Sequence, residues 1–242
     1  MSDIRIHPLH VGTISRHKDS FTYKLGYGQH IDVPLIAWYI EGAEKKILVD
    51  TGGCHPDDPD LKPWVSPYSR PEDQSLLNVL KNKLGLAPDD IEVVIISHLH
   101  WDHCSGNDLF PKAEFIVQKK ELESAKNPIP LFTPIYVKKF IDNFPYTVVD
   151  GDKEIVPGVS VILTPGHSEG LQGVLVDTGS TRYFLAGDNI SLFESLQFNP
   201  YWPTGLYVNL RDCYASYEKI SKLNTTILPA HDMKVFDKMV YS

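Results

Sequence analysis

Short apolar runs recur along the chain and alternate with polar connections. Each run is rich in Val, Ile or Leu, is bounded by Gly, Pro, Asp or Ser, and is apolar at both odd and even positions. Sheet strands that are covered on both faces have this pattern. The runs occupy residues 33–40, 46–53, 92–97, 113–118, 159–164, 173–178, 182–187 and 225–230. We therefore expect a β-sheet core that is buried on both sides.

Two segments between these runs have helical periodicity. The first, residues 75–86, has a stripe of Leu76, Leu77, Leu80 and Leu84, and Gly85 ends it. The second, residues 209–223, has a stripe of Leu210, Tyr214, Tyr217 and Ile220. We interpret both stripes as core-facing, so that helices cover the outer faces of the sheets in a layered α/β protein.

Three longer connections interrupt this rhythm. Residues 54–75 contain five prolines, residues 126–136 contain three more, and residues 193–208 are rich in aromatic side chains. Long connections in a compact protein usually carry function, so we expect these segments to rim a site. None of them has the composition of a linker, which predicts one domain over residues 1–242.

Composition narrows the classes of partner. The formal net charge of the 242 residues is -8, which opposes binding to a nucleic-acid backbone. The N-terminus lacks a basic region followed by an apolar one, and no apolar run approaches the roughly 18 residues that cross a membrane. The three cysteines form no C-x-x-C pair. We predict a cytoplasmic protein with buried thiols, no membrane insertion and a small-molecule substrate.

The segment "SHLHWDHCSGN" at residues 97–107 concentrates metal-binding side chains directly after an apolar run. His98 and His100 project to the same side of an extended segment and can bind one ion. If the chain then turns into a helix, Asp102 and His103 face a second position nearby. Imidazole and carboxylate groups are ligands of zinc, and they also suit Mn, Fe and Co.

Three further apolar runs end in a potential ligand: His167, Asp188 and His231. Strands that release ligands at their ends can bring them to one edge of the sheets. We predict two divalent ions, most consistent with zinc. His98, His100 and His167 would bind the first ion, Asp102, His103 and His231 the second, and Asp188 would bridge them. Two such ions can share a hydroxide whose pKa falls from ~15.7 toward ~7.

The segments "SHLHWDHCSGN", "TPGHSEGLQG", "LAGD" and "PAHD" together resemble the metallo-β-lactamase superfamily, and most of all its N-acyl homoserine lactonase branch. The resemblance extends over almost the whole chain. It implies an αββα sandwich, in which two mixed β-sheets face each other and helices cover their outer faces. Asp188 stands where β-lactamases have a cysteine, and His100 where flavodiiron oxygen reductases usually have a carboxylate. Lactonases of this family have a tyrosine where this chain has Ser191.

The resemblance implies a hydrolase that opens a lactone, in the manner of quorum-quenching enzymes. The bridging hydroxide would attack the carbonyl carbon, and Asp102 would take the proton of the water and return it to the leaving alkoxide. Thioester hydrolysis, as in glyoxalase II, and phosphodiester hydrolysis remain alternatives. A protein that binds metal without catalysis is a third, although structural zinc normally closes four ligands around one ion.

Aromatic residues of the three connections suit an apolar substrate body. The candidates are Trp64, Phe132, Phe193, Phe198, Tyr201, Trp202 and Tyr207. Tyr201 and Tyr207 are also candidates to replace the tyrosine that is absent at Ser191. An alternative for the aromatic set stays open: these side chains close the core or form the contact of a homodimer.

Overall fold

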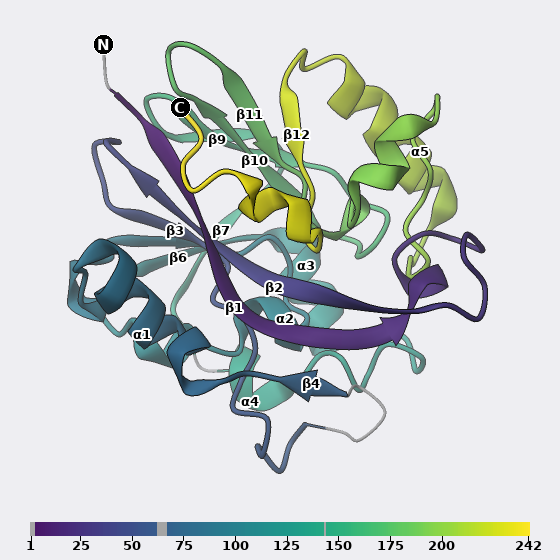
Figure 1. Cartoon of the computed structure of the whole chain (residues 1–242), viewed down its shortest axis with the longest axis horizontal. Coiled ribbons are helices and arrows are strands. Elements are labelled where there is room, and N and C mark those ends of the chain that lie inside the picture. The colour runs from purple at the N-terminus through teal and green to yellow at the C-terminus, as the bar shows by residue number, and fades with distance from the viewer. Residues whose placement is uncertain (1–2, 62–66, 143) are drawn as a thin grey trace.

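The strands of the protein form two sheets in a computed structural model that describes residues 3–61, 67–142 and 144–242 (Figure 1). Within these residues the first sheet has the order β4-β1-β2-β3-β5-β6-β7 and the second the order β12-β11-β10-β9-β8. The strands of the first sheet are β1 (Arg5–His17), β2 (His30–Glu41), β3 (Ile47–Val49), β4 (Tyr68–Ser69), β5 (Val93–Ile95), β6 (Glu114–Gln118) and β7 (Tyr146–Val149). The strands of the second are β8 (Lys153–Val156), β9 (Val159–Leu163), β10 (Gln172–Asp177), β11 (Arg182–Leu185) and β12 (Thr226–Leu228).

Strand direction brings several strand ends to one edge. β3, β5, β6 and β7 run parallel to one another in the first sheet. In the second sheet β10 is antiparallel to both β9 and β11, and β12 is parallel to β11. The strands β9, β11 and β12 therefore share one direction, so that their C-terminal ends lie on the same side of the sheet.

The helices lie outside the two sheets (Figure 1). They are α1 (Leu76–Val79), α2 (Trp101–Cys104), α3 (Lys119–Lys126), α4 (Lys138–Ile141) and α5 (Leu210–Ser221). A wider turn, η4 (Leu80–Leu84), continues α1. The short single-turn helices are η1 (Lys18–Ser20), η3 (Glu72–Gln74), η5 (Pro88–Asp90), η6 (Asn107–Leu109), η7 (Gly187–Asn189), η8 (Phe193–Gln197) and η9 (Met233–Asp237).

The buried apolar residues form three clusters, two of which lie on opposite faces of β5. Val93 and Ile95 of β5 face the second sheet, where they join a cluster with Val161 and Val174. Val94, between them, faces the helical layer of α1 and α4. All three residues of β5 are fully buried, as expected for a strand covered on both sides. The core between the sheets draws on both halves of the chain. One domain over residues 1–242 stays a prediction.

All eight predicted strands are present, but the sequence pattern missed four others: β1, β4, β7 and β8. β1 is the longest strand of the described chain, yet it carries Pro8, Gly12 and three histidines, and its buried positions do not alternate regularly. Its register shifts between His10 and Thr13, where Gly12 has φ 141°. A bulge with positive φ requires glycine, and it breaks the regular alternation that marks a strand.

The prediction that both helical stripes face the core is partly wrong. Leu77 is 39% exposed on the first helix, and Val79 is buried instead. On α5, Tyr214 is 38% exposed, while Cys213 and Ser216 are buried. The small side chain of Cys213 is needed because Gly166 approaches it so closely that a Cβ at Gly166 would lie 2.6 Å from its sulfur. Close packing therefore selects a small residue, where the pattern favoured an aromatic one.

Cys54, Cys104 and Cys213 are free and buried, as predicted. None of the helices in the described ranges has both the length and the apolar character that crossing a membrane requires.

Candidate metal centre

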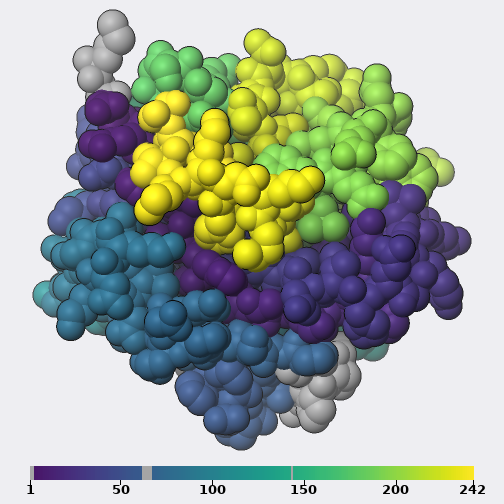
Figure 2. All heavy atoms as spheres, in the orientation of Figure 1, coloured from purple at the N-terminus to yellow at the C-terminus, as the bar shows by residue number. Residues whose placement is uncertain are grey.

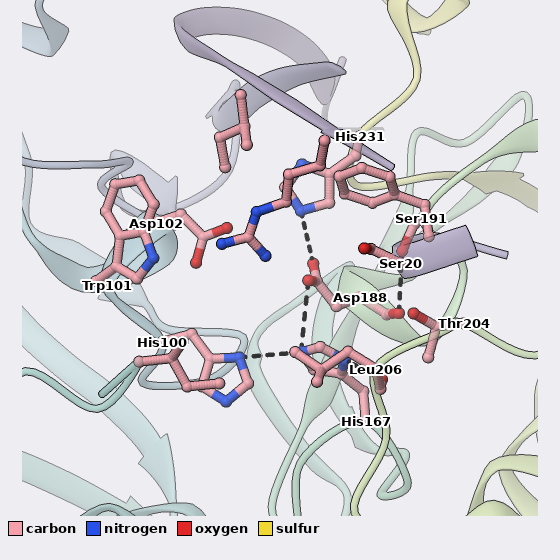
Figure 3. A pocket seen from close by; sticks show the side chains of 14 residues that line it. Ser20, His100, Trp101, Asp102, His167, Asp188, Ser191, Thr204, Leu206 and His231 are labelled. Carbon is pink, nitrogen blue, oxygen red and sulfur yellow. Dashed lines mark hydrogen bonds and ion pairs between the residues drawn. The ribbon is translucent and has the colours of Figure 1, made fainter. Parts of the chain in front are cut away.

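Seven potential ligands meet at the edge where the strand ends gather. Figure 3 shows five of them: His100, Asp102, His167, Asp188 and His231. Each one follows a strand by a few residues. His98 and His100 come after β5, Asp102 and His103 lie in α2, His167 follows β9, Asp188 lies in η7 after β11, and His231 follows β12. Six are buried and Asp102 is half-buried, so the protein holds them away from bulk water.

The ligand atoms form two groups, and those of each group lie within 4.8 Å of one another. One group is His98, His100 and His167, and the other is Asp102, His103, Asp188 and His231. Asp188 faces both. Its Oδ1 lies 3.1 Å from Nε2 of His103 and 3.1 Å from Nε2 of His231, and its Oδ2 lies 3.4 Å from Nε2 of His167. This geometry suits the bridging position predicted for Asp188.

The atoms of both groups are arranged as ligands of an ion. Nε2 of His103, Nε2 of His231 and Oδ1 of Asp188 are buried and have no hydrogen-bond partner despite their short separations. Buried polar atoms without partners are costly, which indicates that something else satisfies them. In the other group, Nδ1 of His100 lies 2.9 Å from Nε2 of His98 and 3.0 Å from Nε2 of His167. Three imidazole nitrogens that converge in this way fit a divalent cation.

The charges of the centre change the pKa values of its histidines in opposite directions. Burial lowers the pKa of His98, His100 and His167, and for His100 the neighbouring His167, His103 and Arg16 add to this effect. Burial is the largest effect on His103 and His231 and disfavours their charged forms, but the neighbouring carboxylates together more than offset it and raise both pKa values. These are Asp188 and Asp102, with Asp50 also acting on His103. The same histidines hold the pKa of Asp188 well below its usual range, against the effect of its burial. Protons and an ion therefore compete for the second group.

Hydrogen bonds on the far side of the rings fix their orientation. Nδ1 of His103 donates to Oδ2 of Asp50 at 2.8 Å, Nδ1 of His167 to the carbonyl of Leu206 at 2.7 Å, and Nδ1 of His231 to the carbonyl of Pro34 at 2.9 Å. Each bond leaves Nε2 directed at the centre, as metal-binding histidines require. Asp50 lies within the predicted run 46–53 and directly follows β3, so the rule that found the ligands would also have marked it.

A buried carboxylate, Glu121 of α3, joins the two segments that carry the first group. Oε1 accepts from the backbone N–H of Leu99 at 2.9 Å and from the hydroxyl of Tyr136 at 3.1 Å. Oε2 accepts from the hydroxyl of Ser168 at 2.6 Å and from the backbone N–H of Gly170 at 3.1 Å. Leu99 lies between His98 and His100, and Ser168 follows His167. No sequence pattern indicated this role for Glu121.

A cavity opens onto the two groups (Figure 3). It is lined by His100, Asp102, His167, Asp188 and His231, by Ile14, Arg16, Ser20 and Phe21 of the N-terminal part, and by Trp101, Ile135, Ser191, Thr204 and Leu206. The wall formed by residues 14–21 was not predicted, because it comes from the end of β1, which the sequence pattern missed. Ser191 is buried, and its hydroxyl donates to the carbonyl of Asp188 at 3.3 Å.

The predicted substrate residues take different places, and their contact with substrate stays a prediction. Trp64 lies outside the described residues. Phe132 lines a second, adjoining cavity that also contains His100. The described lining of the main cavity contains none of Phe193, Phe198, Tyr201, Trp202 and Tyr207.

These five aromatics instead pack against protein. Phe193 packs on the core between the sheets, and Tyr201 and Tyr207 on the cluster beneath α5. Phe198 and Trp202 pair with ring centroids 4.9 Å apart, and Trp202 donates to the carbonyl of Tyr23. The alternative in which loop aromatics close the core therefore describes these side chains better.

Known proteins resemble the chain over most of its length. A family model described as the metallo-beta-lactamase superfamily matches residues 36–231. An N-acyl homoserine lactonase of Bacillus sp is 36% identical over 160 residues, which is 62% of this chain and 61% of the relative. The match thus spans about three fifths of that relative's length. The N-acyl homoserine lactonase AiiB of Agrobacterium fabrum is 27% identical over 237 residues, covering 88% of this chain and 84% of the relative.

Solved structures agree. An N-acyl homoserine lactone hydrolase with the product N-hexanoyl-L-homoserine bound at its catalytic metal center superposes with a TM-score of 0.83 at 26% identity, covering 98% of this chain and 96% of that one. The predicted αββα arrangement of two facing sheets with outer helices is confirmed. The family match and the two groups of potential ligands both indicate that the protein binds divalent metal ions. Since the family match extends from β2 to His231 and takes in all seven ligands, the chain belongs to the metallo-β-lactamase superfamily.

Proposed function

We propose that this protein is a metal-dependent hydrolase that opens a lactone, such as an N-acyl homoserine lactone. The observation that carries the proposal is the pair of ligand groups that face each other across Asp188 beside an open cavity. The relatives and the structural neighbour named above are lactonases and a lactone hydrolase, which supports the same substrate class.

Two divalent ions bound at these groups would polarise the ester carbonyl and lower the pKa of a water between them. We propose zinc, because it takes imidazole and carboxylate ligands in hydrolases, with Mn, Fe and Co accepting the same donors. His98, His100 and His167 would hold one ion, Asp102, His103 and His231 the other, and Asp188 both.

Asp102 is the residue of this chain that we assign to proton transfer. It lines the cavity, and its Oδ2 lies 3.8 Å from Nε2 of His103. Its carboxylate would take the proton of the attacking water and return it to the ring oxygen as the carbonyl carbon–oxygen bond breaks. The product then carries a carboxylate and a hydroxyl on one molecule.

Hydrolysis of a thioester or a phosphodiester is the second candidate, since the same groups would serve it. A purely structural metal centre is less favoured. Structural zinc closes four ligands around one ion, whereas seven ligands in two groups beside a cavity leave room for water and substrate.

The test is metal analysis of the purified protein, followed by turnover of N-hexanoyl homoserine lactone, an acyl thioester and a phosphodiester. We expect about two divalent ions per chain and ring opening of the lactone that stops when a chelator removes them. Turnover of only the thioester or the phosphodiester would replace the lactone proposal, and turnover of none would support a binding protein.

A further inference from the structure

Among the described residues that line the cavity, Arg16 is the only lysine or arginine. It is half-buried near the end of β1, on the wall that also contains Ile14, Ser20 and Phe21. Phe21 packs against His231 with ring centroids 5.6 Å apart, so this wall adjoins the metal groups directly.

Contacts with the segment after η8 hold the wall in place. The indole N–H of Trp202 donates to the carbonyl of Tyr23 at 2.7 Å, and the N–H of Tyr23 donates to the carbonyl of Pro203 at 2.9 Å. Lys18 pairs with Glu194 at 2.6 Å. A Cβ at Gly205 would overlap the carbonyl oxygen of Asp19, so the two backbones meet without space for a side chain. The chain that follows Arg16 is therefore anchored at several points, and a ligand that meets its side chain meets a prepared position.

The remaining polar residues of the lining do not supply a comparable charge. Ser20 and Thr204 carry neutral hydroxyls, and the hydroxyl of Ser191 donates to the backbone of its own turn. Asp102 and Asp188 belong to the metal groups, where divalent ions would more than balance their charge. With two divalent ions bound, the charges of Asp102 and Asp188 would leave the centre positive and Arg16 would add to it, and such a cavity would attract an anionic ligand.

A guanidinium recognises the two oxygens of a carboxylate or phosphate through a planar fork of N–H donors. We propose that Arg16 binds an oxyanion carried by the substrate beside its scissile ester, so that the preferred substrates are lactones with a carboxylate or phosphate substituent. This inference rests on the proposed hydrolase function and narrows its substrate class: neutral N-acyl homoserine lactones would be opened, but with lower kcat/KM than lactones that carry an oxyanion. Arg16 is a specificity-determining residue in this scheme, and the metal groups remain responsible for bond cleavage.

The experiment compares three γ-lactones that differ only in one ring substituent: a carboxylate, a phosphate and a neutral carboxamide. With the metal-loaded enzyme we expect kcat/KM for the better of the two anionic lactones to exceed that of the carboxamide by about tenfold or more, and the anionic pair shows which oxyanion fits. Arg16→Gln should remove this preference, mainly through KM, because the anionic lactones lose more kcat/KM than the carboxamide does. Arg16→Lys should keep part of it, because the charge remains without the fork.

The control is Arg5→Gln. Arg5 lies at the other end of β1 and pairs with Asp3 and Glu41 on the surface, so this variant loses the same charge from the same strand. Its substrate preference should match that of the wild type. Metal content and thermal midpoint of each variant show whether Arg16→Gln retains the folded centre.

A second readout separates this inference from the proposed function. Calorimetry measures the binding of the three ring-opened acids to the metal-loaded wild type and to Arg16→Gln. All three ring-opened acids carry the carboxylate formed by ring opening, so the comparison concerns the ring substituent. If no lactone is hydrolysed but the acids with a carboxylate or phosphate substituent bind about tenfold more weakly to Arg16→Gln, while the carboxamide acid does not, the lactonase proposal fails and the anion site stands. If the lactones are hydrolysed without preference for charge, or if the preference survives in Arg16→Gln, the inference is overturned and the hydrolase proposal stands. If no lactone is hydrolysed and Arg16→Gln binds the acids as well as the wild type does, both the hydrolase proposal and the anion site are refuted.

Discussion

Asp50 and Asp102 both lie beside His103 but have different surroundings. Asp50 is buried, has φ 60°, and accepts hydrogen bonds from the backbone and hydroxyl of Ser97 as well as from the His103 ring. Asp102 lines the cavity, where it can meet water and substrate. One carboxylate therefore orients a ligand, and the other is placed for chemistry.

Asp102→Asn tests the proton-transfer role. General acid–base help is worth ~10²- to 10⁴-fold, so we expect kcat to fall by that factor while the fold persists. The measurement is steady-state kinetics on the lactone, with metal content determined on the same samples because Asp102 is also a predicted ligand. Full turnover by a variant that retains two ions would exclude Asp102 from the mechanism.

Asp50→Asn tests the orientation of His103. The amide keeps the shape of the side chain but removes the negative charge behind the imidazole, and loss of such a partner typically costs about 10- to 100-fold in metal affinity. We expect weaker binding of one ion and little change for the ion held by His98, His100 and His167. Competition with a chelator measures both affinities. Asp57→Asn, at a 92% exposed side chain, is the matched control, and equal affinities in the two variants would refute the role.

The seven potential ligands could be found from sequence because each follows a recognisable strand run within a few residues. Arg16 could not, since its strand alternates irregularly around the bulge at Gly12. The aromatics of residues 193–208 were prominent in composition, but burial decides their role. Trp202 and Tyr207 contact Tyr23 rather than the cavity. Composition indicates which side chains are apolar, and only packing shows where they point.

At the scale of elements, α3 matters because it joins segments that are far apart in sequence. Glu121 accepts from Leu99, at the end of β5, and from Ser168 and Gly170, after β9. A Cβ at Gly170 would overlap the backbone nitrogen of Glu121, so α3 and this loop are in direct backbone contact. A helical pattern predicts a face that packs, but the partners of a buried carboxylate depend on tertiary contacts.

Glu121→Gln tests this connection. All four of its partners donate, so the amide group of glutamine would face donors in place of an acceptor oxygen. One unsatisfied buried group costs about 1–3 kcal/mol, which corresponds to roughly 2–4 °C in thermal midpoint per kcal/mol for a chain of this size. Metal affinity of the group with His98, His100 and His167 should fall as well.

Calorimetry and chelator titration provide the two measurements for Glu121→Gln. Glu123→Gln is the control, because Glu123 lies on the exposed side of the same helix. If Glu121→Gln retained the wild-type midpoint and both metal affinities, Glu121 would be dispensable for positioning the loops.

At the scale of the whole molecule, the two sheets meet at the metal centre and at the chain ends. Each ligand group takes residues from both halves: His98 and His100 with His167 in one, Asp102 and His103 with Asp188 and His231 in the other. Figure 2 shows C-terminal residues lying over the N-terminal strand, and Tyr241 exchanges two backbone hydrogen bonds with Ile6. Ions at the centre would therefore connect the halves at a second place.

This arrangement predicts that metal removal lowers stability by an amount that depends on pH. An ion that binds only the folded state stabilises it by about 4 kcal/mol when its free concentration is a thousand times its Kd. The raised pKa values of His103 and His231 mean that the metal-free protein holds protons there near neutral pH, and these protons compete with the ion. A raised histidine pKa stabilises the metal-free fold fully below the unfolded value of ~6.5, and this stability is lost as pH rises through the folded pKa.

Rising pH acts in the same direction on the stability gap through the metal-free protein and through metal affinity. As pH rises from 6 to 8, the metal-free protein loses the stability from these protonated histidines, and affinity for the second ion increases by up to about tenfold per pH unit for each proton displaced. The gap in thermal midpoint between metal-loaded and chelator-treated protein should therefore widen with pH. The group with His98, His100 and His167 should contribute little to this trend, because the lowered pKa values of its histidines leave them neutral throughout. Scanning calorimetry at pH 6, 7 and 8 measures the gap, and a gap that is constant or narrows would mean that protons and metal do not compete for this site.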